Sequence, residues 1–124
     1  MMKKLLTAVV LGLSALSFNL AFAHGGSEPK HGGVVQTASD LSFELVGTPD
    51  GALIYIEDHG KPLAPTGFKG KLTVLSGANK SEAALVVVDN KLQAKGIQLA
   101  KGAKVVAALV TPAAKAITVR FTVR

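Results

Sequence analysis

From Val34 onward the chain consists of short runs in which apolar and polar residues alternate, and this pattern limits it to an all-β fold. In the run LSFEL (41–45) both leucines and the phenylalanine share one face, and ITVRFTV (117–123) alternates in the same way. A period of two is the repeat of a β-strand. No window of a dozen residues carries the apolar stripe of a helix.

Turn residues separate these runs and divide the chain into eight predicted strands. Asp89-Asn90, between two strand-like runs, is typical of a tight hairpin. Seven or eight short antiparallel strands in a chain of this length favour an immunoglobulin-like β-sandwich, with a small Greek-key barrel as the alternative. The predicted strands are Val34–Gln36, Leu41–Val46, Leu53–Glu57, Lys71–Leu75, Ala83–Val88, Lys91–Ala94, Lys104–Val110 and Ala116–Val123.

The first 23 residues have the organisation of a secretory signal peptide. Lys3 and Lys4 give a basic start, an apolar stretch covers 5–20, and Ala21-Phe22-Ala23 supplies the small residues that a signal peptidase requires. We therefore expect removal of 1–23 and a periplasmic location. No membrane anchor is expected after processing, because the apolar stretch is short and no basic cluster follows it.

The remainder is predicted to be a flexible arm followed by one domain. Residues 24–33 (HGGSEPKHGG) contain no apolar side chain and are read as the arm, and 34–124 as the β-sandwich domain. The lysines are spread along the chain without a basic run or interleaved aromatic residues, so nucleic-acid binding is not expected. Enzymatic activity is not expected either, because no nucleophile motif or phosphate loop occurs.

Three histidines, His24, His31 and His59, are candidate metal ligands, and each is followed by glycine. Imidazole is the commonest protein ligand for metal ions, including Zn, Cu and Ni, and a neighbouring glycine leaves it uncrowded. Cleavage after Ala23 would expose the α-amine of His24 beside its own Nδ1, a chelate that favours Cu(II). Asp58 adds a candidate oxygen ligand. The alternatives are a polar leader without a role and, for His59, a simple turn residue.

Four segments carry a resemblance to a known family: HGGVV (31–35), the strand LSFELV (41–46), the stretch IYIEDHGKP (54–62) and the tail ITVRF (117–121). They resemble an N-terminal domain of periplasmic adaptor subunits of heavy-metal RND efflux pumps, of the cobalt-zinc-cadmium and copper kind, and related small stand-alone proteins. The resemblance implies an accessory metal-binding unit and points to His31, His59 and Asp58. It does not extend to the adaptor's hairpin, lipoyl-like and barrel domains, so adaptor function is not expected.

Together these observations predict a periplasmic heavy-metal-binding protein, a buffer or metallochaperone associated with metal efflux or resistance. The expected ion is a divalent transition metal, with Cu(II) favoured and Zn(II), Co(II) or Ni(II) possible. An RND adaptor or pump subunit is the expected protein partner. The alternative is an interaction module that docks to an efflux or envelope complex and binds no metal.

Overall fold

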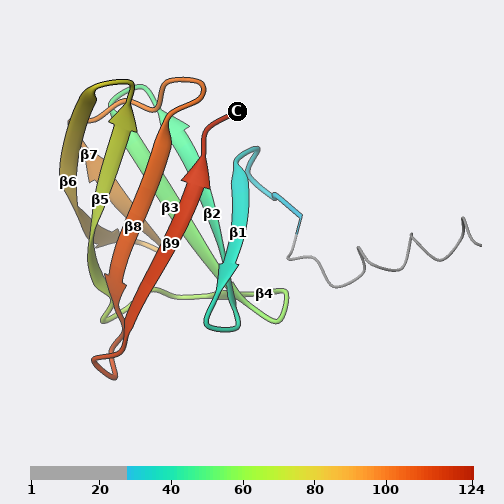
Figure 1. Cartoon of the computed structure of the whole chain (residues 1–124). Helices are drawn as coiled ribbons and strands as arrows, with labels where there is room; N and C mark the ends of the chain where they lie inside the picture. The colour runs from blue at the N-terminus through green and yellow to red at the C-terminus, as the bar shows by residue number, and fades with distance from the viewer. Residues whose placement is uncertain (1–27) are drawn as a thin grey trace, which may run out of the picture.

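Nine antiparallel strands make up the part of the chain that the computed structural model describes, residues 28–124 (Figure 1). The all-β prediction is confirmed, and each of the eight predicted strands coincides with an observed one. The unpredicted strand, β4, pairs only with the end of β3. The strands are β1 (Val34–Ala38), β2 (Leu41–Thr48), β3 (Gly51–Asp58), β4 (Lys61–Leu63), β5 (Lys69–Ser76), β6 (Asn79–Val88), β7 (Lys91–Lys95), β8 (Lys104–Val110) and β9 (Ala116–Thr122).

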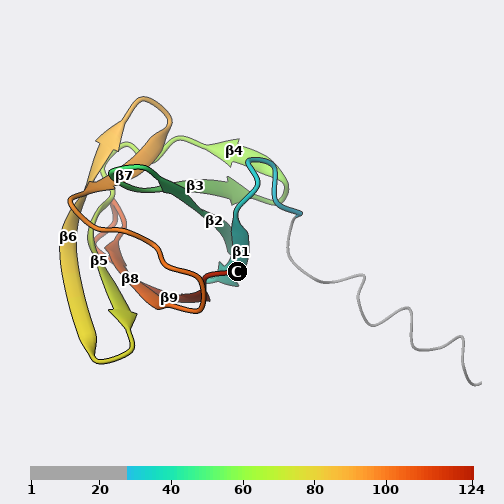
Figure 2. The same cartoon turned by 90° about the horizontal axis from the view of Figure 1, so that it is seen from above.

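The strands form one sheet in the order β1-β2-β3-β7-β6-β5-β8-β9, which curls into a nearly closed barrel (Figure 2). Strand β6 turns the corner between two layers: residues 79–85 pair with β5, and Val86–Val88 pair with β7. The layers are therefore β1-β2-β3-β7 and β5-β8-β9. The end strands β1 and β9 lie side by side, but no backbone ladder joins them among the residues described.

The alternation seen in the sequence decides which side chains fill the barrel. On β5, Leu72 and Val74 are buried, whereas Lys71 and Leu75 face solvent. Both layers contribute to one apolar core. The chain has no cysteine, so this core forms without a disulfide and depends on apolar packing. The largest fully buried apolar side chains are Phe43, Ile54, Leu72, Leu92, Leu109, Val105, Val119 and Pro65.

Tight turns connect the paired strands and expose their central residues. In the β3–β4 hairpin, Asp58 pairs with Lys61, and the two loop residues His59 and Gly60 have φ values of 52° and 83°. Positive φ at both central residues is the requirement of a type I′ hairpin turn, which glycine meets without strain. This turn places His59 at the tip of the hairpin.

Residues 28–124 contain no helix long and apolar enough to cross a bilayer.

Candidate functional site

The end of the predicted flexible arm, residues 28–33, lies against the outer face of β2 and β3. Its anchor is Glu44, which points outward from β2 yet is only 6% exposed because this segment covers it. The Glu44 carboxylate accepts hydrogen bonds from the backbone N–H groups of Lys30 (3.0 Å), His31 (2.8 Å) and Gly33 (2.8 Å). This part of the arm is therefore held in place, which its polar composition did not predict.

The Glu44 carboxyl is charged at neutral pH although it is buried. Burial by itself would raise its pKa, but hydrogen bonds from the His31 ring and from the backbone of Gly33, Lys30 and His31 outweigh this effect and hold the pKa below its ordinary value. A buried carboxylate with this many donors is a strong local anchor, because charge-assisted hydrogen bonds exceed neutral ones in strength.

The ring of His31 is fixed in a single orientation by two contacts. Its Nδ1 lies 2.9 Å from Glu44 Oε1, and its face stacks on Tyr55 with ring centroids 3.6 Å apart and planes 4° from parallel. Because an ionised carboxylate only accepts hydrogen bonds, Nδ1 is the donor. In the neutral ring the proton then sits on Nδ1, and Nε2 keeps its lone pair on a side chain that is 42% exposed.

Two glycines allow the segment to approach β2 this closely. Gly32 has a φ of 77°, a conformation that other residues rarely adopt. A Cβ at Gly33 would overlap the carbonyl oxygen of Leu45 and lie 2.9 Å from Val46 Cγ2. The His-Gly-Gly sequence is thus a docking element in which the backbone must turn and then lie flat on β2.

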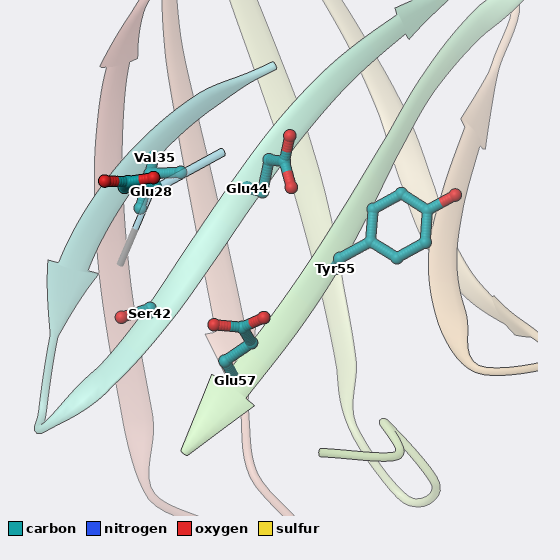
Figure 3. A pocket seen from close by; sticks show the side chains of 6 residues that line it. All are labelled: Glu28, Val35, Ser42, Glu44, Tyr55 and Glu57. Atoms are coloured by element: carbon teal, nitrogen blue, oxygen red, sulfur yellow. The ribbon is translucent and has the colours of Figure 1, made fainter. Parts of the chain in front are cut away.

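Lys30 extends the docked segment toward the β3–β4 turn. Its Nζ is 2.6 Å from Glu57 Oε2 and 3.5 Å from the carbonyl oxygen of Gly60. Glu57 also lines a cavity of about 10 Å³, room for roughly one water molecule. Glu57 Oε1 is buried there without a hydrogen-bond partner among the described residues. Figure 3 shows the lining side chains, which are Glu28, Val35, Ser42, Glu44, Tyr55 and Glu57.

The second predicted pair, His59 and Asp58, is exposed at the hairpin tip. His59 Nδ1 lies 2.6 Å from Asp58 Oδ1, and the two side chains are 85% and 50% exposed. This pair repeats the contact of His31 with Glu44, since a carboxylate again accepts a hydrogen bond from Nδ1–H. A hydrogen bond from Lys30 Nζ to the carbonyl oxygen of Gly60 (3.5 Å) joins the docked segment to this turn.

His31 and His59 lie in one region of the surface but do not share a site in this conformation. His31 stacks on Tyr55, and His59 lies four positions after Tyr55, in the turn just beyond the end of β3. At the rise of a strand, four positions span roughly 13 Å. Among residues 28–124, no group of three or more His, Asp or Glu side chains is arranged to hold a metal ion. His24 and the predicted signal peptide, 1–23, lie outside the described residues.

Sequence reasoning named His31, His59 and Asp58 but missed the parts played by Glu44, Tyr55 and Lys30. The alternation of LSFEL places Glu44 on the outer face, where an acidic residue is unremarkable, and nothing in the pattern reveals the segment that covers it.

Comparison of the chain with protein-family models, with curated proteins and with solved structures found no match.

Proposed function

We propose that this protein binds a divalent transition-metal ion outside the cytoplasm and acts as a metal buffer or metallochaperone. Cu(II) is the favoured ion, and Zn(II), Co(II) and Ni(II) are the alternatives. The family resemblance suggests an efflux adaptor or pump subunit as the partner that receives the ion. His31 and His59, with His24 from the leader, are the proposed ligands.

The observation that carries the proposal is the carboxylate on Nδ1 of each described histidine. Glu44 accepts a hydrogen bond from Nδ1–H of His31, and Asp58 accepts one from Nδ1–H of His59. In protein metal sites a carboxylate in this position fixes the tautomer, orients the ring and makes the other nitrogen a better ligand. Nε2 is then the metal-binding atom, and Asp58 supports a ligand instead of coordinating the ion itself.

The docked segment also brings the leader within reach of both histidines. Glu28 follows His24 by four positions, a span of at most about 14 Å for an extended chain. Lys30 Nζ already contacts the carbonyl oxygen of Gly60 beside His59. The amine and imidazole of His24 could therefore complete a nitrogen site with Nε2 of either His31 or His59, as Cu(II) prefers.

Calorimetric titration of the exported protein with Cu(II), Zn(II), Co(II) and Ni(II) tests the proposal, after intact-mass analysis has identified its first residue. We expect His31→Asn to weaken binding at least tenfold, since it removes a ligand. Glu44→Gln should weaken binding by about 10- to 100-fold, as removal of an outer carboxylate typically does. Asp58→Asn should reduce the contribution of His59 to the metal affinity.

Asp89→Asn is the matched control for Asp58→Asn. Asp89 is also an exposed acid at a hairpin turn, with a φ of 55°, and it has no neighbouring histidine. We expect the control to leave affinity unchanged. Unaltered binding of every metal by a His31→Asn/His59→Asn double variant would contradict the proposed ligands.

A further inference from the structure

Charge is divided between the two layers of the barrel. Residues 28–58, which form the docked segment and β1 to β3, contain six acidic side chains and one lysine. Residues 59–124 contain eleven lysines and arginines and two acidic side chains. β5, β8 and β9 form the layer opposite β1 to β3, so five of these cations lie across the barrel from the acidic residues of 28–58 (Figure 2). Lys61, Lys91 and Lys95 belong to β4 and β7, beside β3. The molecule therefore has an acidic side and a basic side.

The strand register shows that the cations share one surface. Residues directly opposite each other in antiparallel strands point to the same side of the sheet. One row across β6, β5, β8 and β9 is Lys80, Leu75, Lys104 and Thr122, and the next is Glu82, Thr73, Val106 and Arg120. We call this surface the basic face; its cations are Lys69, Lys71, Lys80, Lys104 and Arg120.

Acidic residues hardly reduce the charge of the basic face. Of the outward positions of β5, β8, β9 and residues 79–85 of β6, all within the described chain, only Glu82 is acidic. Glu82 lies 3.5 Å from both Lys71 and Lys80, and the positive charge of Lys71, then of Lys80, holds the pKa of Glu82 below its ordinary value. Five cations and one anion remain exposed together.

The side chains between the cations are small or aliphatic. Leu75 (40% exposed) lies between Lys80 and Lys104, and Val110 (42% exposed) lies opposite Lys69. A shallow hollow of about 400 Å³ opens among them, lined in part by Leu75, Lys104 and Arg120. The described outward positions of these strands carry no aromatic side chain, so the face lacks the platforms that stack on nucleic-acid bases.

The same composition argues against a specific protein interface and for a lipid surface. Protein interfaces depend on buried tryptophan, tyrosine and arginine, and lysine is depleted in them. Exposed lysines are instead suited to a fluid layer of anionic headgroups, where each contributes separately and no fixed geometry is needed. Aliphatic residues between lysines add shallow contact with the boundary of the acyl chains.

We propose that the basic face binds the surface of a bilayer that contains anionic phospholipids. Binding is peripheral and electrostatic, and it fixes the orientation of the protein, because the acidic side is repelled by the same surface. The docked segment with His31 and the β3–β4 turn then face away from the membrane, toward the aqueous phase. This inference does not depend on metal binding.

Flotation of the exported protein with lipid vesicles tests this proposal. The vesicles contain either phosphatidylcholine alone or phosphatidylcholine with 30 mol% phosphatidylglycerol, a composition chosen to give roughly the charge of an anionic leaflet. In about 20 mM salt we expect partitioning into the anionic vesicles at least tenfold above that into the neutral ones. About 300 mM salt should abolish most of it, because screening confines the attraction to a few ångströms.

Two double variants with the same change in net charge separate the basic face from overall charge. Lys69→Gln/Lys104→Gln removes two cations of the face, and Lys61→Gln/Lys95→Gln removes two exposed lysines from β4 and β7. We expect a loss of about tenfold or more for the first pair and less than about threefold for the second. Circular dichroism and thermal unfolding check that both variants fold.

Three results would overturn the proposal. One is equal binding to neutral and anionic vesicles at low salt, and another is an equal loss in the two double variants. The third is binding to soluble polyglutamate with none to the anionic vesicles, which would assign the face to an acidic protein. Analytical ultracentrifugation of the same samples would reveal whether a second copy of the chain occupies the face instead.

Discussion

At the scale of single residues, the central finding is a buried carboxylate that holds a polar segment through hydrogen bonds. Glu44 satisfies three backbone N–H groups and one imidazole of the segment 30–33. Hydrophobic patterns cannot reveal such docking, because its stabilisation comes from charge-assisted hydrogen bonds in a site shielded from water. The sequence suggested only that the glycines leave the imidazole uncrowded, whereas the structure shows that Gly33 lies too close to Leu45 for a larger residue.

Glu44 should make the stability of the protein dependent on pH. Its pKa in the folded protein lies below the unfolded value of about 4.3. Its contribution is therefore complete above that value and is lost as the pH falls through the folded pKa. We expect Glu44→Gln to lower the free energy of unfolding by about 1–3 kcal/mol at pH 7, because the buried donors lose their anionic acceptor.

Urea denaturation of both proteins between pH 7 and pH 3 checks this expectation. The difference in unfolding free energy should stay constant above about pH 5 and shrink below about pH 4. A difference that is the same at pH 3 and pH 7 would show that the Glu44 charge does not stabilise the docked segment. The Asp89→Asn variant again serves as a control for loss of one acidic charge.

At the scale of strands, period-two alternation located nearly every element. The interior of the barrel is apolar and its outer surface faces solvent, so runs such as LSFEL and ITVRFTV alternate between apolar and polar residues. The alternation did not predict two features, strand β4 and the start of strand β6. β4 has three residues, one of which is Pro62, and is too short for alternation to show. β6 begins at Asn79, four residues before the predicted start, because its polar first residues pair with β5.

Two leucines of β5 allow the assignment of inner and outer faces to be tested with one chemical change. Leu72 is fully buried, and Leu75, three positions on, is 40% exposed. Leu72→Ala should lower the free energy of unfolding by about 2–5 kcal/mol because it leaves a cavity in the core. Leu75→Ala should change it by less than about 1 kcal/mol. Urea denaturation measures both, and similar losses would mean that the register of β5 is wrong.

At the scale of the whole molecule, the topology creates properties that no local stretch of sequence contains. The lysines are spread along the chain without a run, yet the register of β6, β5, β8 and β9 gathers five cations on one face. Prediction of eight strands did not give their order, so neither this face nor the approach of β1 to β9 was foreseeable. The sequence contains the separation of acidic residues (28–58) from basic residues (59–124), but only the strand order shows that they lie on opposite sides of the barrel.

The junction between β1 and β9 provides the last prediction, because the barrel is closed there by proximity and not by a backbone ladder. β5 is flanked by hydrogen-bonded partners on both sides, β6 and β8, along its length. N–H groups that point into the junction from β1 or β9 have no such partner strand, so local opening exposes them more readily. We expect their amide hydrogens to exchange roughly 100-fold faster than those of β5.

Hydrogen–deuterium exchange followed by NMR at neutral pH resolves these amides individually. Within β9, amides bonded to β8 should be protected, and alternate amides that face β1 should exchange first. This alternation is the signature of an edge strand, whereas fraying of the whole strand would remove protection from both sets. Uniform strong protection along β1 and β9 would mean that a ladder closes the barrel in solution, and the sheet would then have no free edge at this junction.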